Sequence, residues 1–286
     1  MIAINQNNTF LRHFESWEEY LHRAIHGKSA LKDHKRSSRV GFGELYGTDT
    51  FDEAVKLALN GWPEGRENIK NITQKISHVL ASKIVRPQAR YSETGEEVDV
   101  PRFVSGDPEH FIDYPMSVCN GHGNIVRVGV SLSTSGDVEA QYIHNRGAAI
   151  VALIDALETV GYRVELDFMN ASKNGSAYYD VMVPIKQADQ PCELDRIAFV
   201  FAHAANQRRI GFSVNETDTK EVVKKFGFYN SGGYGEPADS KTKNEYDFYF
   251  GFVYSGTQYP WTSSQSATVE ILRLCKSTGI IELTES

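Results

Sequence analysis

The sequence predicts an α/β protein with a doubly wound, mainly parallel sheet and a helical N-terminal region. From residue 124 onward, β-branched apolar runs alternate with helix-length segments, a pattern typical of parallel strands covered by helices on both faces. Before residue 86 the apolar spacing is helical, and a stretch rich in Pro and Gly separates the two parts. We therefore divide the chain into a helical N-terminal region (1–86), an irregular connector (87–123) and an α/β domain (124–286).

In the N-terminal region, apolar side chains recur at three- and four-residue steps over 10–26 and predict a helix. Ser16 and Glu19 match a capping box, so a helix that starts at Ser16 is an alternative. Further helices are predicted over 49–60, with Thr50 as its cap, and over 64–83. The connector contains one predicted strand at 98–104. Since it is long for a loop, we expect it to pack on the body and to carry function.

In the α/β domain, apolar and β-branched runs predict five strands, and longer amphipathic segments predict three helices. Residues 227–245 are polar and Gly-rich, which predicts a surface loop. The predicted strands are 125–133, 162–168, 178–186, 208–214 and 246–254, and the predicted helices are 141–160, 194–206 and 262–278.

The 286 residues are 41% hydrophobic, which is enough to bury a substantial core. The chain has no run of 18 apolar residues, and its first residues lack the features of a signal peptide. We therefore expect a cytoplasmic protein (in the host cytoplasm, for a viral protein) with no membrane partner. Cys119, Cys192 and Cys275 are widely spaced and form no CxxC pair, so buried thiols are the favoured interpretation.

Several catalytic motifs are excluded by spacing. Gly27-Lys28-Ser29 resembles the end of a phosphate-binding loop, but the residue five positions before Gly27 is His22 instead of Gly. The chain has neither the GxSxG of α/β-hydrolases nor the GxGxxG of dinucleotide sites, and its nine histidines lack metal-ligand spacing. We therefore expect a non-enzymatic protein, and a metal-dependent hydrolase is the least supported alternative.

Charge is distributed unevenly along the chain. Residues 1–90 hold 14 basic and 10 acidic residues, a balance of +4, whereas residues 91–286 hold 16 and 27, a balance of −11. The loop 22–39 concentrates the basic residues, with Asp33 as its one acid, which suits phosphate contacts. Its six cations are Arg23, Lys28, Lys32, Lys35, Arg36 and Arg39.

Aromatic residues flank this loop: Trp17, Tyr20 and Phe42 are placed to stack on unpaired bases, and Arg208-Arg209 is a candidate extension of the same surface. Two alternatives remain open at this point. The loop is either simply solvated or neutralised by docking on the acidic body.

One constellation has the form of a known ion site. The strand at 125–133 leads into Ser131-Leu132-Ser133-Thr134-Ser135-Gly136-Asp137, then a helix, then Gly161-Tyr162-Arg163-Val164-Glu165. This order resembles a von Willebrand factor A domain, in which DxSxS ends the first strand and holds Mg²⁺. Ser131, Ser133 and Ser135 fall on the D, S and S positions. Since the first carboxylate is missing, the resemblance implies a degenerate site that binds Mg²⁺ weakly or not at all, with Asp137 the one nearby substitute.

Other segments are similar to a group of uncharacterised proteins from bacteriophages and mobile elements. These segments are Phe42, Gly47-Thr48, Phe51-Asp52-Glu53-Ala54, Gly61-Trp62, Pro101-Arg102-Phe103 and Gly106-Asp107-Pro108-Glu109. That resemblance implies a viral accessory protein without a known reaction.

Two functions are compatible with these features. One is the recruitment of a protein partner through the loops at the strand ends, including 131–137 and 215–245, as implied by the A-domain resemblance. The alternative is a single-stranded DNA-binding factor that uses the basic loop and brings a viral polymerase or replication protein to DNA.

Overall fold

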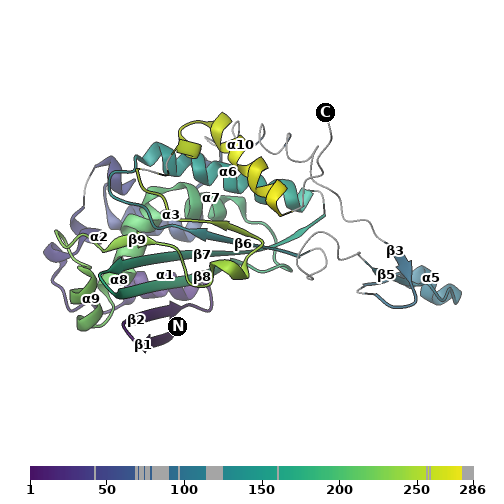
Figure 1. Cartoon of the computed structure of the whole chain (residues 1–286), viewed down its shortest axis with the longest axis horizontal. Coiled ribbons are helices and arrows are strands. Elements are labelled where there is room, and N and C mark those ends of the chain that lie inside the picture. The colour runs from purple at the N-terminus through teal and green to yellow at the C-terminus, as the bar shows by residue number, and fades with distance from the viewer. Residues whose placement is uncertain are drawn as a thin grey trace.

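A mixed seven-stranded sheet forms the centre of the protein (Figure 1). The computed structural model describes residues 1–41, 43–67, 90–95, 97–113, 125–159, 161–255 and 259–278, together with residues 70, 74, 78 and 257. The strands follow the order β1-β2-β8-β7-β6-β10, and β9 pairs with β7 beside this path. They are β1 (Ile2–Gln6), β2 (Thr9–His13), β6 (Ile125–Ser131), β7 (Arg163–Asn174), β8 (Ala177–Lys186), β9 (Glu236–Ala238) and β10 (Phe248–Phe250).

The centre of the sheet follows the predicted α/β pattern. Strands β10, β6 and β7 run parallel, and Val126, Val128 and Val130 of β6 are fully buried. Strand β8 reverses direction, because only Gly175 and Ser176 lie between the last pair of the β7–β8 ladder and such a short connection joins antiparallel strands. Strand β2 is parallel to β8, and β1 is antiparallel to β2. The fold is therefore a mixed α/β architecture.

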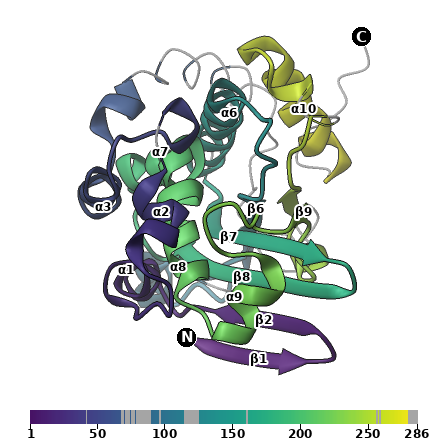
Figure 2. The same cartoon turned by 90° about the vertical axis from the view of Figure 1, so that its left-hand side faces the viewer.

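The long helices cover the sheet and share one hydrophobic core with it. Helix α6 (Ala140–Thr159) contacts both α7 (Leu194–Ala202) and α10 (Ser264–Ser277), and all three lie above the sheet in Figure 1. The predictions of helices at 141–160 and 262–278 are thus confirmed within two residues. Figure 2 shows the other helices that lie around the sheet, which are α1 (Trp17–His26), α3 (Phe51–Asn60), α8 (Phe212–Glu216) and α9 (Lys220–Phe226).

The N-terminal region is not purely helical. The predicted helix over 10–26 is wrong for its first turn, where residues 9–13 form β2 and alternate between buried and half-buried positions. The alternative start is confirmed, since Ser16 caps α1 by accepting a hydrogen bond from the Glu19 amide at 3.2 Å. Thr50 caps α3 in a full capping box, as predicted. Most of the helix predicted over 64–83 lies outside the described residues.

Three strand predictions are wrong in whole or in part. Residues 208–214 are helical, in the π-helical turn η3 (Asn206–Gly211) and α8, because the side chains of Arg208 and Arg209 bond to carbonyl groups of distant segments. Over 98–104, β4 (Glu97–Val98) ends early, because Asp99 caps α5 (Val100–Ser105), which has a proline in its first turn. The aromatic strand at 246–254 shortens to β10 and one isolated bridge at Val253.

The loop predicted over 227–245 contains β9 and the short turn η4 (Lys243–Glu245). Within the described residues, no helix combines the length and the apolar composition that spanning a bilayer requires. The remaining short elements are η1 (Asp33–Lys35), α2 (Ser37–Val40), η2 (Glu44–Tyr46), β3 (Arg90–Ser92), β5 (Phe111–Asp113) and η5 (Tyr259–Trp261).

Candidate functional site

The serines of the predicted ion loop are engaged in holding the loop to the sheet. Ser131 is fully buried at the end of β6. Ser133 Oγ donates to the Ala171 carbonyl and accepts from the Ala171 amide, each at 2.8 Å, which ties the loop to β7. The Ser135 hydroxyl donates to the exposed carboxylate of Asp137, and this bond lowers the pKa of Asp137. These hydroxyl groups serve as structural hydrogen-bonding groups.

Two buried guanidinium groups organise the same loop. Arg146 of α6 donates to the carbonyl oxygens of Ser131, Phe250 and Gly251 at 2.9–3.0 Å. Arg208 donates to the carbonyls of Ser135 and Val138 at 3.2 and 3.3 Å. Burial lowers the pKa of each arginine to about 10, so both stay charged at neutral pH.

This donor set does not fit a divalent cation. Mg²⁺ is held chiefly by carboxylate charge, and here positive guanidinium groups occupy the loop carbonyls while the Ser133 hydroxyl is already bonded. Among the described residues, no group of three or more His, Cys, Asp or Glu side chains is arranged to hold a metal. The weak Mg²⁺ site implied by the A-domain resemblance therefore has no support from the geometry.

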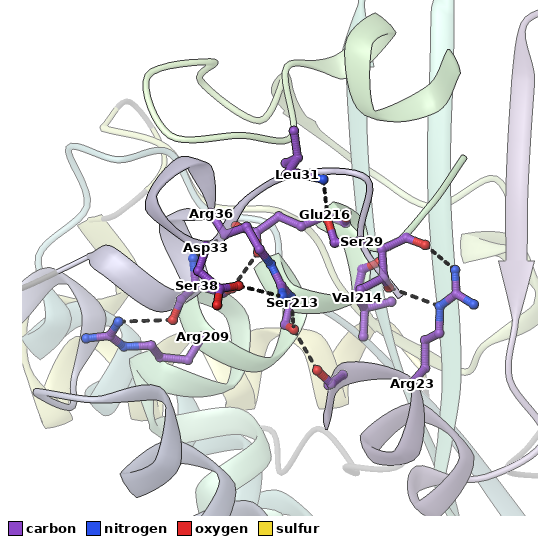
Figure 3. A network of polar contacts seen from close by, with 12 residues as sticks. Arg23, Ser29, Leu31, Asp33, Arg36, Ser38, Arg209, Ser213, Val214 and Glu216 are labelled. Atoms are coloured by element: carbon purple, nitrogen blue, oxygen red, sulfur yellow. Dashed lines mark hydrogen bonds and ion pairs between the residues drawn. The ribbon is translucent and has the colours of Figure 1, made fainter. Parts of the chain in front are cut away.

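The basic loop docks on the body through a buried ionic network (Figure 3). Glu216 of α8 is fully buried and accepts hydrogen bonds from Arg36 Nε at 3.0 Å and from the Ser38 amide at 2.9 Å. The Ser38 hydroxyl and the Tyr234 hydroxyl also donate to this carboxylate. Arg36 further donates to Ser213 Oγ at 3.0 Å. Arg36 is only 6% exposed, so a phosphate group would have to displace Glu216 to reach it.

The other two arginines of the loop are also engaged in internal contacts. Arg23 Nε donates to Thr217 Oγ1 at 3.0 Å, and the guanidinium also bonds to the Thr217 carbonyl. Arg39 lies over the Phe51 ring at 3.6 Å, and burial with the neighbouring Arg36 lowers its pKa. The lysines differ, because Lys28, Lys32 and Lys35 are all exposed.

The aromatic residues predicted to stack on bases belong to the core. Trp17 and Tyr20 are 2% and 1% exposed and stack on each other at 5.7 Å, so the proposed stacking role is a misinterpretation of core residues. Phe42 lies outside the described residues. Arg208 and Arg209 are buried as well, and the guanidinium of Arg209 bonds to the carbonyls of Ser38, Thr48 and Asp49. Those two arginines connect segments instead of extending a basic surface.

A second feature lies in the connector. Residues 90–113, which we call the arm, form a three-stranded antiparallel sheet of β3, β5 and β4 with α5 beside it. The arm projects to one side of the body in Figure 1, contrary to the expectation that the connector packs on the body. A half-exposed ion pair between Arg163 and Glu97, at 3.6 Å, links its described residues to the body.

The surface of the arm is both apolar and acidic. None of its described residues is buried, and Val100, Phe103 and Val104 of α5 are 62%, 59% and 78% exposed. Tyr91 and Val98 are exposed beside them, each at 45%. In the sequence, residues 90–113 contain two basic and seven acidic residues, a net charge of −5. In the sequence, we marked this stretch by its Pro and Gly content, by a predicted strand at 98–104 and by the resemblance that includes Pro101-Arg102-Phe103, but not by its combination of acidic and large apolar residues.

These features define a mixed α/β protein whose strand-end loop is held by arginines and whose connector presents an exposed acidic, apolar arm. The chain belongs to the family described as a domain of unknown function, DUF7192, whose model matches residues 3–281. That match takes in the N-terminal region, the arm and the body together. No curated protein and no solved structure matches the chain.

Proposed function

We propose that this protein is a non-enzymatic recruiting protein that binds a protein partner through the arm. The supporting observation is the exposure of Val100, Phe103 and Val104 on a module with no buried described residue. Three short strands and one helix need a covered apolar face for stability. Large contiguous apolar surface that stays exposed is typical of protein interaction sites.

The arm is locally well ordered by polar and aromatic contacts. Asp99 accepts from the Arg102 amide at 3.1 Å and caps α5, and Gly106 ends α5 in the left-handed region with φ of 78°. Arg102 lies over the Tyr91 ring at 3.5 Å. The Phe103 ring packs edge-on against His110 at 5.1 Å between ring centroids, yet it stays 59% exposed. These contacts fix α5 while its apolar side chains remain exposed, which is a preorganised arrangement for binding.

The charge of the arm favours one kind of partner. With a net charge of −5, the arm complements a basic protein surface that offers an apolar pocket to Phe103 and Val104. A buried aromatic anchor, surrounded by contacts that exclude water and by a polar rim, is the usual organisation of an interaction hot spot. This proposal keeps the recruiting function expected from the sequence, including its role as a viral accessory protein, and places the contact on the arm.

Paired serine substitutions test this proposal. The 286-residue chain is immobilised and used to capture partners from the native host extract, with a Phe103→Ser/Val104→Ser variant and a Val269→Ser control. Val269 is 67% exposed on α10 and lies outside the arm. We expect one capture partner to be lost in the arm variant, retained in the control and weakened by moderate salt. Identical capture by all three proteins would contradict the proposal.

A second function, binding of nucleic-acid phosphates, is favoured by the position of the exposed lysines. Segment 28–35 is anchored along 216–230 at both ends: Ser29 Oγ donates to the Glu216 carbonyl at 2.6 Å, and the Asn230 amide donates to the Lys35 carbonyl at 2.8 Å. Helix α9 lies within that stretch and adds two exposed cations. This lysine face consists of Lys28, Lys32, Lys35, Lys220 and Lys224.

The lysine face predicts phosphate contacts without base stacking, because Trp17 and Tyr20 are buried. In fluorescence anisotropy at low and moderate salt, we expect single-stranded and duplex DNA to bind with similar salt dependence. Replacing Lys28, Lys32 and Lys35 by Ala reduces the salt slope by about 3 if each lysine contacts one phosphate. The matched control replaces the exposed Lys56, Lys243 and Lys276. Equal slopes for the two triple variants exclude the lysine face as the contact.

A further inference from the structure

The sheet leaves a pocket where β7 changes partners. Strand β6 pairs with β7 as far as Ser131 and Met169, and beyond that point β9 takes its place beside Ala171 and Ser172. Between the departing loop and β9 lies a cavity of about 240 Å³, which we call the strand-end pocket. Ligands of open α/β sheets bind at such points, outside the carboxyl ends of strands. Its polar lining includes Ser135, Asn170, Ser172, Gln207, Arg208 and Asn215.

The wall of this pocket contains a buried positive charge without a counter-charge. Arg208 is 3% exposed, and its guanidinium bonds to three carbonyl oxygens, those of Leu45, Ser135 and Val138. Within the described part of the chain, no carboxylate forms an ion pair with it. Arg146, which bonds to the start of the same loop, also forms no ion pair within the described residues, although the Asp239 carboxylate lies near enough to raise its pKa. Buried charges in proteins are normally paired with an opposite charge, so this arrangement calls for an anion.

Two further groups in the lining lack partners. Ser172 Oγ and Asn215 Oδ1 are buried and form no hydrogen bond to any described residue. The two residues are only 9% and 5% exposed. Buried polar atoms without a partner are rare in folded proteins and require an explanation, such as a bound ion or water. Ser172 can donate a hydrogen bond through its hydroxyl. Asn215 Oδ1 is an acceptor, and a 180° turn of the side-chain amide, which breaks no hydrogen bond within the described residues, brings its NH2 group to the same position as a donor.

The amides of Asn170 and Gln207 complete a donor-rich lining. The oxygen of each is already engaged, since Asn170 Oδ1, 3.1 Å from Ser133 Oγ, shares the hydroxyl hydrogen of Ser133 with the Ala171 carbonyl, and Gln207 Oε1 accepts from Thr134 Oγ1. Neither NH2 group donates to a residue that the structure describes. The lining therefore offers hydroxyl and amide donors next to a fixed cation, and its one carboxylate, Glu236, is exposed to solvent.

We propose that the strand-end pocket binds a small oxyanion, a carboxylate or a phosphate, beside Arg208 with Ser172 and Asn215 as hydrogen-bond donors. Oxyanions are the ligands that arginine with amide and hydroxyl donors recognises best. The expected ligand is an anion, whereas the A-domain resemblance implies a cation, Mg²⁺, at this loop. The inference is independent of the arm and of the lysine face, since it uses none of their residues.

The loop positions that define the pocket are preorganised. Ser133 is bonded to Ala171 in both directions, and Arg208 joins the loop to Leu45 of the N-terminal region. Binding therefore requires no rearrangement of these walls, because they are already ordered in the folded chain and little conformational entropy is lost when the anion binds. An oxyanion bound here adds stability to the folded state, and its effect on thermal unfolding follows from mass action.

The test is isothermal titration calorimetry of the full chain with inorganic phosphate and with citrate, at constant ionic strength, with glucose as a neutral control. We expect saturable binding of at least one oxyanion at one site and none of glucose. The decisive variant is Ser172→Ala, because removal of an unpartnered hydroxyl leaves the unliganded fold intact. We expect it to weaken oxyanion binding about tenfold or more, the effect of losing one hydrogen bond to a charged group.

A second variant, Arg208→Gln, removes the charge and abolishes binding, with circular dichroism confirming that the fold is retained. Where that variant fails to fold, Asn215→Ala takes its place, with the same expected loss as Ser172→Ala. Saturable binding that is unchanged in Ser172→Ala and Asn215→Ala would place the anion elsewhere and overturn the proposal. Absence of binding by both oxyanions in the unmodified protein would overturn it as well.

Discussion

Neutralising Glu216 should destabilise the protein by several kcal/mol. Its fully buried carboxylate accepts from Arg36 Nε, the Ser38 amide, the Ser38 hydroxyl and the Tyr234 hydroxyl. Glu216→Gln keeps the shape but removes the charge, and it directs an NH2 group at one of these donors. Removing one partner of a buried ion pair costs about 3–5 kcal/mol, because it leaves Arg36 charged with only the exposed Asp33 as a counter-charge.

This cost is large compared with the total stability of a domain, which is about 5–15 kcal/mol. At roughly 2–4 °C per kcal/mol for a chain near this size, the melting temperature falls by about 10 °C. The assay is equilibrium unfolding in urea, followed by tryptophan fluorescence, because Trp17 is buried in the same core. Tyr234 remains a donor throughout, since burial and the adjacent Glu216 carboxylate raise its pKa.

The matched control uses the same arginine. Asp33 forms an ion pair with Arg36 at 3.6 Å, but its side chain is 84% exposed, whereas that of Glu216 is fully buried. Asp33→Asn should therefore cost less than about 1 kcal/mol, as is usual for exposed pairs. If Glu216→Gln costs no more than Asp33→Asn, the network does not hold the N-terminal segment on the body and the reasoning is refuted.

Three further predictions concern titration, thiol reactivity and capping. Burial raises the pKa of Asp167 to about 6, so the folded state binds the proton more strongly and stability falls as pH rises from about 4 to 6. Asp167→Asn should therefore increase the free energy of unfolding in urea by roughly 1–2 kcal/mol at pH 7 and leave it unchanged at pH 4. An equal increase at both pH values would contradict this. Burial raises the pKa of the Cys192 and Cys275 thiols to about 12. Both should therefore be alkylated at pH 8 on the order of a hundredfold more slowly than in denatured protein, as measured by peptide mapping with mass spectrometry. Equal alkylation rates in folded and denatured protein would argue against burial of the thiols. Thr50→Ala removes the cap of α3 and should cost about 1 kcal/mol in urea unfolding, with Thr50→Ser close to neutral; equal losses in the two variants would assign the effect to something other than the cap.

Elements with a strong local signal could be predicted from the sequence. Helix α6 and strand β6 follow their apolar patterns, and the caps at Ser16 and Thr50 lie where hydroxyl residues precede acidic ones. These features depend on neighbours within a few residues, so local composition determines them.

Other elements depend on distant partners. Residues 208–214 have the composition of a strand, yet they are helical where Arg208 and Arg209 reach carbonyls more than 150 residues away in sequence, at Leu45, Ser38 and Thr48. No local pattern records these contacts. For the same reason, the basic loop has the composition of a phosphate-binding segment although Glu216 lies beneath Arg36.

The sequence by itself therefore determined the α/β class, the buried central strand β6, the helices beside it and the excess of cations in the N-terminal region. Only the tertiary structure decided which of those cations face solvent, that the strand-end loop is held by arginines, and that the arm leaves its apolar side chains exposed. The physical reason is that propensity and periodicity are local, whereas burial and charge pairing are set by segments that meet only in the folded chain.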